Sequence, residues 1–227
     1  NFAHNKIFRY SLLNQGFDVT ALTLDQDVPE DVNVLVIAEM KTPFSDEELE
    51  RLNRYVERGG NLLIAGDAER QEVMNPVVAP FGVKFLPGRL VQSGEHVANL
   101  IVGNVTRESC DLNYMFRDMF HVYTVTMPDA VALECDTTKG FTATPLLVTK
   151  NKGSWIEYKT TDFVDDKAEL NPEDGEVEQA NLTALALNRK VGDKDQKIII
   201  LGDADCISNG EISRQRSNII ASNYSFI

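Results

Sequence analysis

Two apolar runs in this sequence end in the same way, and their endings could do chemistry. Leu62–Ala65 and Ile198–Leu201 are each followed by Gly, Asp, Ala and a second acid. Paired carboxylates can serve as general acid and nucleophile or base in glycoside hydrolysis, hold Ca²⁺ or Mg²⁺ as oxygen ligands, or bind a partner. A more ordinary role for an Asp at such a place is to cap or turn the chain. The predicted ligand-binding residues are Asp67, Glu69, Asp203, Asp205 and Asn209.

Other site chemistries find little support. A nucleophilic triad needs a nucleophile with a base in reach, and the turn after Leu62–Ala65 carries no Cys or Ser. The sequence has no CxxC pair and no glycine-rich phosphate loop, so we predict no metal, no nucleotide and no other cofactor. The cysteines, which are predicted to be unpaired thiols, are Cys110, Cys135 and Cys206.

Composition narrows the class of partner. The net charge of −13 argues against nucleic acid, because a polyanion is bound by a basic surface. A hydrophobic content of 43% is enough for a substantial core. No run approaches the roughly 20 apolar residues of a membrane span. The start at Asn1 and the end at Ile227 suggest a piece of a longer protein whose membrane segments lie outside it.

The elements that would position the acidic pairs form a β-α-β unit over Val34–Asp67. Ser45 followed by Glu48 predicts a capping box at the start of a helix, and Gly59 predicts its end. The flanking runs lack alternation, which favours strands buried on both sheet faces. Both Gly-Asp runs are expected to leave the sheet at one edge, where open α/β sheets bind ligands.

The whole chain is predicted to be one α/β domain, with a mostly parallel sheet flanked by helices. Its core would comprise residues 1–86 and 181–227, interrupted by a β-rich insertion over about 87–180. Other expected elements are helices at 5–15, 68–80 and 211–221, a strand at 17–24, a hairpin joining 146–148 to 155–158, an acidic loop at 162–178 and a strand at 181–188.

The chain resembles the ABC-type transport auxiliary family, which includes the gliding-motility-associated auxiliary proteins of Bacteroidetes. The segments that carry the resemblance are Val34–Glu39, Phe44–Gly60, Leu62–Asp67, Pro145–Trp155 and Ile198–Asn209. The helix-strand pattern of Asn5–Leu24 also fits, and the resemblance then covers most of the chain. The resemblance implies a glutamine-amidotransferase-like (flavodoxin-like) fold without the catalytic Cys. It also implies an extracytoplasmic (periplasmic-side) domain tethered to the inner membrane, with an ABC permease and ATPase as partners.

Two functions follow as hypotheses. The first is a non-catalytic domain of an ABC transporter auxiliary protein that binds a partner subunit or a cell-envelope ligand around Asp67 and Asp203. The second is a hydrolase acting on glycans through the paired carboxylates, which would require them to line one cleft with raised pKa values. A structural spacer is a third reading that the sequence does not separate from the first.

Overall fold

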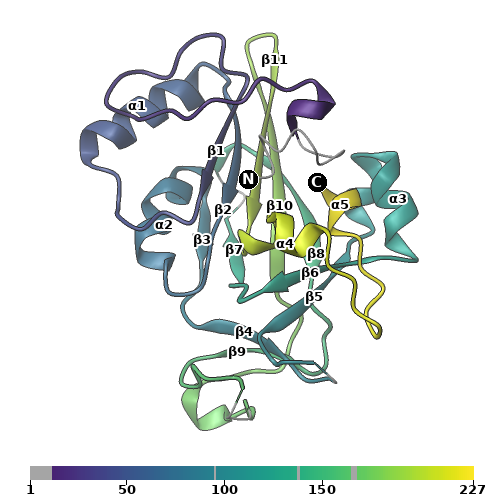
Figure 1. Cartoon of the computed structure of the whole chain (residues 1–227). Helices are drawn as coiled ribbons and strands as arrows, with labels where there is room; N and C mark the ends of the chain where they lie inside the picture. Colours follow the sequence, from purple (N-terminus) through teal and green to yellow (C-terminus); the bar gives the residue numbers. More distant parts are fainter. Residues whose placement is uncertain (1–11, 95, 137–138, 165–167) are drawn as a thin grey trace.

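The computed structural model describes residues 12–94, 96–136, 139–164 and 168–227. It is a mixed α/β fold in which a curled sheet carries most of the regular structure, with a few short helices packed around it (Figure 1). The helices are α1 (Asp46–Glu57), α2 (Gln71–Val78), α3 (Tyr114–Phe120), α4 (Asn209–Ile212) and α5 (Asn223–Phe226). The strands are β1 (Val34–Ala38), β2 (Asn61–Ala65), β3 (Val83–Phe85), β4 (Arg89–Gln92), β5 (Leu100–Val105), β6 (Thr124–Pro128), β7 (Leu133–Cys135), β8 (Thr142–Val148), β9 (Ser154–Glu157), β10 (Leu182–Val191) and β11 (Lys194–Leu201).

The β-α-β unit predicted from the sequence is confirmed. Strands β1 and β2 pair in parallel along their whole length, and α1 connects them. Ser45 and Glu48 form the predicted capping box, in which the backbone N–H of Ser45 donates to the Glu48 carboxylate at 2.7 Å. Gly59 follows the helix at φ 86°, a left-handed conformation that a residue with a Cβ rarely adopts. Local sequence therefore specifies this unit.

The prediction of a mostly parallel sheet is wrong. The main sheet has the order β1-β2-β11-β10-β8-β5-β6, with β7 beside β10 and β3, and among the described residues only β1, β2 and β11 run parallel to one another. The other pairings are antiparallel because β10 turns back into β11 at Gly192 and the middle of the chain adds hairpin-like neighbours. This topology does not confirm a flavodoxin-like or glutamine-amidotransferase-like fold.

The two strands that end in Gly-Asp lie side by side. β2 and β11 pair in parallel from Leu62↔Ile198 to Ala65↔Leu201, and the N–H of Gly66 donates to the carbonyl of Leu201 at 2.8 Å. The predicted common edge is therefore confirmed.

Strand β1 lies at the edge of the sheet and is not buried on both faces, as its apolar sequence had predicted. Ile37 is buried beneath the helices, but Val34 and Val36 are 49% and 51% exposed on the opposite face. An edge strand has one strand neighbour instead of two, and no described helix covers this face of β1.

The middle of the chain is β-rich as predicted, but one predicted pairing is wrong. β8 does not form a hairpin with β9; it pairs with β10 and β5, whereas β9 pairs with β4 in a separate two-stranded sheet. Strands β5 to β8 join the same sheet as β2 and β11. The sequence does not reveal such long-range choices, because each apolar run can pair with several others.

Three further local predictions fail in whole or in part. Residues 17–24 form no strand, and the helix expected at 211–221 is instead the short α4 followed by an irregular loop. Of the helix expected at 5–15, residues 5–11 lie outside the described part, and Leu12–Gln15 form a 3-10 turn. The helix expected at 68–80 is α2, with Pro76 inside it.

The core has two layers, one on each face of the sheet. On one face α1 and α2 pack Leu52, Tyr55 and Met74 against Ile64 and Ile200. On the other face α3, α5 and the segment after β11 cover β5, β6, β8 and β10 through residues such as Met119, Met127 and Cys206. The end of the chain is therefore part of the second layer.

Asn223 fixes that last segment to strand β6. Its side chain is 3% exposed; Oδ1 accepts the N–H of Thr126 at 2.9 Å, and Nδ2 donates to the carbonyls of Thr126 (2.7 Å) and Cys206 (2.9 Å). Glu211, 5% exposed, is paired with the Arg216 guanidinium beside the same threonine. This polar network holds α4 and α5 beside the ends of β6 and β11.

We expect Asn223→Ala to lower the free energy of unfolding by about 2–3 kcal/mol, because it leaves the buried backbone groups of Thr126 and Cys206 without partners. Chemical denaturation measures the change. Ser217→Ala, in the exposed loop before α5, is the control and should leave stability unchanged. An Asn223→Ala variant as stable as the wild-type protein would contradict the role of the network.

Candidate functional site: an acidic edge of the sheet

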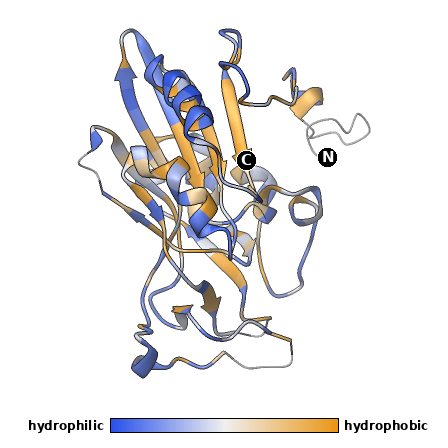
Figure 2. Cartoon of the chain, turned by 90° about the vertical axis from the view of Figure 1, so that its left-hand side faces the viewer, coloured by the Kyte–Doolittle hydropathy of each residue, from blue (hydrophilic) through white to orange (hydrophobic). Residues whose placement is uncertain are grey.

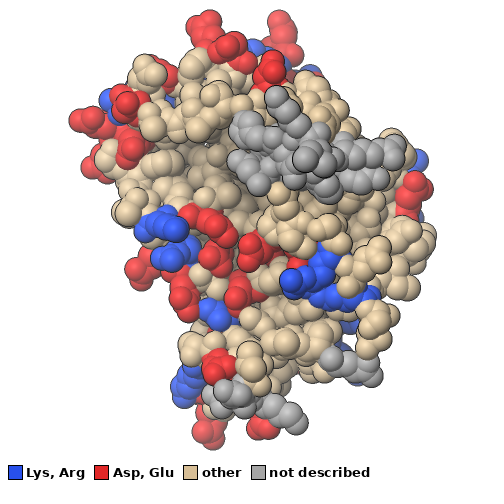
Figure 3. Space-filling view, viewed as in Figure 1, with Lys and Arg blue, Asp and Glu red and all other residues tan. Residues whose placement is uncertain are grey.

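The carboxyl ends of β1, β2 and β11 meet at one edge and bring acidic side chains together. Figure 3 shows acidic residues gathered across the middle of the face where these strand ends lie in Figure 1, with basic residues on either side. Three neighbouring carboxylates raise the pKa of Asp67 by their charge, which places them all near it. We call this group the acidic edge: Glu39, Asp67, Glu69, Asp129, Asp203 and Asp205.

The glycines of the two Gly-Asp turns are required by close packing. A Cβ on Gly66 would lie 2.6 Å from the Phe85 ring, and one on Gly202 would lie 2.2 Å from the carbonyl oxygen of Val131. The N–H of Val131 donates to the Gly202 carbonyl at 2.9 Å. The similarity between the two Gly-Asp runs therefore has a packing origin. The glycine required at the end of each strand sets the position of the aspartate that follows it.

Asp203 is a buried turn residue. It is 1% exposed, and its carboxylate oxygens accept the backbone N–H groups of Asp205 (2.8 Å) and Cys206 (3.0 Å). Burial raises the pKa of Asp203 well above its usual range, and the charges of Asp205 and Asp67 act in the same direction against the two N–H donors. The ordinary role of an Asp at such a place, turning the chain, therefore accounts for the contacts of Asp203. Asp203 lines neither of the two cavities described below.

Asp67 is half-buried and lies among three other carboxylates that act on its pKa. Burial raises its pKa, and the charges of Glu39, Asp129 and Asp205 raise that pKa further. The backbone N–H of Ala68 opposes the shift. A cation brought to this point would relieve the repulsion at Asp67.

Arg89 is the counter-ion of the edge. This side chain, 15% exposed, lies 2.8 Å from Glu69 and 3.3 Å from Asp129, and its guanidinium lies over the Phe163 ring. Asp129 also accepts a hydrogen bond from Asn99 at 2.8 Å. Glu69 and Asp129 are therefore held by protein partners, and Glu69 remains largely solvent-exposed.

The predicted site residues differ in what they offer a ligand. Asp205 is exposed two residues beyond Asp203. Asn209 begins α4, and its buried Oδ1 has no hydrogen-bond partner among the described residues. The structure thus leaves Asp67, Glu69 and Asp205 accessible and keeps Asp203 inside.

Sequence reasoning missed Glu39, Arg89 and Asp129. Glu39 directly follows β1, a position that could have been found from the strand-end rule applied to Asp67. In the described ranges the non-glycine residues with positive φ are Glu39, Glu69 and Asp129, at 45°, 66° and 58° respectively. Such strained conformations gather at functional sites, but no sequence signal marks them in acidic residues.

Cys206, which follows Asp203 and Asp205 in the chain, is poorly suited to act as a nucleophile. Cys206 is fully buried, its Sγ donates to the Asp203 carbonyl at 3.0 Å, and burial raises its pKa well above the usual range. A thiol held in its protonated form is a poor nucleophile. Cys110 and Cys135 are partly buried and unpaired with other cysteines, as predicted.

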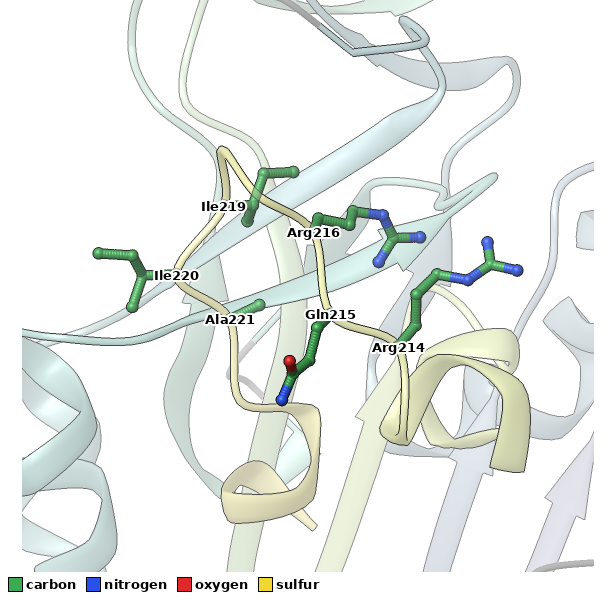
Figure 4. A pocket seen from close by; sticks show the side chains of 6 residues that line it. All are labelled: Arg214, Gln215, Arg216, Ile219, Ile220 and Ala221. Atoms are coloured by element: carbon green, nitrogen blue, oxygen red, sulfur yellow. The ribbon is translucent and has the colours of Figure 1, made fainter.

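No metal site is evident in the described ranges, where no group of three or more His, Cys, Asp or Glu side chains is arranged to hold an ion. Two cavities lie away from the acidic edge. One of about 210 Å³ is formed by the loop from Arg214 to Ala221, where Arg214 and Arg216 extend to the same side (Figure 4). The other, of about 400 Å³, is lined by residues near the β10–β11 turn, among them Arg189 and Lys197.

Comparison with known protein families assigns the chain to a family. A family model described as "ABC-type uncharacterized transport system" matches residues 2–225. The chain belongs to this family. The match confirms the resemblance read from the sequence motifs and makes the protein an auxiliary component of an ABC transport system. Membership in a transport auxiliary family also favours a role without catalysis.

Structural comparison adds a likeness of fold to the family assignment. The auxiliary protein is similar to a solved structure described as "mmIFT52 N-terminal domain", with a TM-score of 0.56 and 16% sequence identity over 79% of this chain and 69% of that one. At this identity the likeness concerns the fold alone. No curated protein matches the chain. In the described part of the chain, every helix is too short or too polar to cross a bilayer.

We expect Asp67→Asn to raise the free energy of unfolding at pH 7 by about 0.5 kcal/mol, because it removes a carboxylate that burial and its neighbours disfavour. Folding raises the pKa of Asp67 above its ordinary 3.8. The stabilising contribution of this carboxyl is therefore complete below that value and is lost as the pH rises through the folded-state pKa. The free energy of unfolding of the variant should accordingly equal that of the wild-type protein near about pH 3 and exceed it at higher pH.

Denaturant titrations across this pH range test the prediction. Asp193→Asn, in the exposed turn between β10 and β11, is the matched control and should change stability little at any pH. If Asp67→Asn were destabilising at neutral pH, the carboxylate would be needed as an acceptor and the repulsion argument would be wrong.

Proposed function

We propose that this protein is the extracytoplasmic domain of a membrane-anchored ABC transporter auxiliary protein, and that its acidic edge binds a basic surface of a partner subunit or a cell-envelope ligand. The family match over residues 2–225 carries the proposal. The partners we propose are the permease and the ATPase of the same system, and the anchor would be transmembrane helices outside residues 1–227. The kinship with gliding-motility auxiliary proteins of Bacteroidetes belongs to this proposal as well.

The geometry supports a binding role over a catalytic one. The hydrolase alternative needs two carboxyl groups free to act on one substrate. Of the four carboxylates in that hypothesis, Asp203 is committed to its own turn and Glu69 is paired with Arg89. Asp67 and Asp205 remain, and neither of them lines one of the two cavities described above. The raised pKa of Asp67 is the observation in favour of catalysis, and it is equally expected of a carboxylate awaiting a cationic partner.

Neutralising the accessible part of the edge tests the binding role. We expect the triple variant Asp67→Asn/Glu69→Gln/Asp205→Asn to reduce capture of the co-expressed permease and ATPase from solubilised membranes at least about tenfold, because each lost charged contact costs roughly 0.5–1 kcal/mol at an exposed site. Capture by the wild-type protein should also weaken as salt is added.

A charge-matched control separates a local site from the overall acidity of the protein. Glu50→Gln/Glu57→Gln/Asp193→Asn removes three exposed carboxylates from α1 and the β10–β11 turn, and Glu57 and Asp193 precede the starts of β2 and β11, at the opposite end of these strands from the acidic edge. This control should capture the subunits as well as the wild-type protein does. Equal losses in the two triple variants would reduce the effect to net charge, and no loss in either would refute a binding role for the edge.

The proposed location has its own test. In the full-length protein, Tyr114→Cys places a thiol at a position where the native side chain is 71% exposed. We expect a membrane-impermeant maleimide to label this variant in intact spheroplasts above the wild-type background. Labelling only after the spheroplasts are lysed would place the domain in the cytoplasm.

A further inference from the structure

Strand β1 presents an open sheet edge that is independent of the acidic side chains. It is the terminal strand of the main sheet, with β2 on one side and no strand among the described residues on the other. Its sequence is apolar throughout, and Figure 2 shows it as a continuous hydrophobic strand beside α1. The exposed Val34 and Val36 are part of this edge.

The pairing with β2 determines which backbone groups face outward. The N–H of Glu39 donates to the carbonyl of Ala65, so in the parallel ladder the odd-numbered residues of β1 direct their N–H and C=O groups to β2. The same groups of Val34, Val36 and Ala38 therefore point to the open side. No hydrogen bond joins them to another described residue.

Strand β1 lacks three of the features with which proteins protect a free edge. Strand β1 contains no charged residue, no proline and no interruption of its register with β2. A strand of this kind is a template for another extended segment, whose backbone would pair with the open groups while its side chains cover Val34 and Val36.

The charges that flank β1 favour a basic partner strand over a second copy of the chain. Residues 28–44 contain the acids Glu30, Asp31 and Glu39, which flank β1, against the single base Lys41, and the chain carries a net charge of −13. A second copy of the chain would bring the same acidic flanks to the edge. A partner strand that is apolar in its centre and basic at its ends would meet opposite charge instead.

We propose that the open edge of β1 is a docking site for an extended strand of a partner protein, apolar in the centre and flanked by Lys or Arg. The strand would extend the main sheet by backbone hydrogen bonds to Val34, Val36 and Ala38. This surface lies next to the acidic edge at Glu39, but it binds through backbone groups and stands without the function proposed above.

A synthetic strand tests the proposal on the 227-residue chain. The probe is a fluorescent peptide of alternating Val and Thr flanked by lysines, with blocked ends, and binding is followed by anisotropy. We expect saturable binding, and at least about tenfold weaker binding when the central amides of the peptide are N-methylated, because several hydrogen bonds are then lost. Replacing the flanking lysines by glutamates should weaken binding as well.

A matched pair of variants assigns the binding to β1. Val36→Pro removes an outward N–H and keeps the bonds to β2, whereas Val36→Thr keeps the N–H at the same exposed position. We expect the proline variant to lose binding about tenfold and the threonine variant to keep it. Thermal unfolding of both variants verifies that they are folded, and Val36→Lys replaces the proline variant if that one is not.

Three results would overturn the proposal: no binding of the lysine-flanked peptide, equal binding of the N-methylated peptide, or equal binding by the folded proline and threonine variants. Sedimentation of the chain alone supplies a fourth outcome. A concentration-dependent dimer that Val36→Pro abolishes would assign the edge to a second copy and refute the partner strand.

Discussion

The structure depends on the parallel contact between β2 and β11. These strands are far apart in the sequence, yet they pair in register, and Gly66 donates to the carbonyl of Leu201 just beyond the ladder. The contact needs glycine at the end of each strand, since a Cβ at Gly66 or Gly202 would overlap the Phe85 ring or the carbonyl of Val131. It joins the β-α-β unit to the antiparallel remainder of the sheet.

Bringing two acidic strand ends together has an electrostatic cost that the surrounding structure offsets unequally. Asp203 is stabilised by two backbone N–H groups, and Arg89 neutralises Glu69 and Asp129. Asp67 receives little such compensation, and its pKa is raised by burial and by three neighbouring carboxylates. The repulsion left at Asp67 is the physical basis for expecting a basic partner at this edge.

Family membership and architecture point in the same direction. The family name implies association with an ABC transport system, and we propose two surfaces of the sheet for contacts with other proteins. One is a charged surface at the carboxyl ends of the parallel strands, and the other is the unpaired backbone of β1. The cavities formed by the 214–221 loop and near the β10–β11 turn lie apart from the acidic edge.

The sequence by itself determined the local units: the capped helix α1, the apolar strands around it and the two Gly-Asp turns, because caps, glycines and apolar runs act over a few residues. It also indicated the family and the common edge of β2 and β11. Tertiary structure alone decided the antiparallel majority of the sheet, the pairing of β8 with β10 and the position of β1 at an open edge. It alone separated Asp203, turned inward onto its own backbone, from the accessible Asp67, and added Arg89 and Asp129, because these roles depend on contacts between residues distant in the chain.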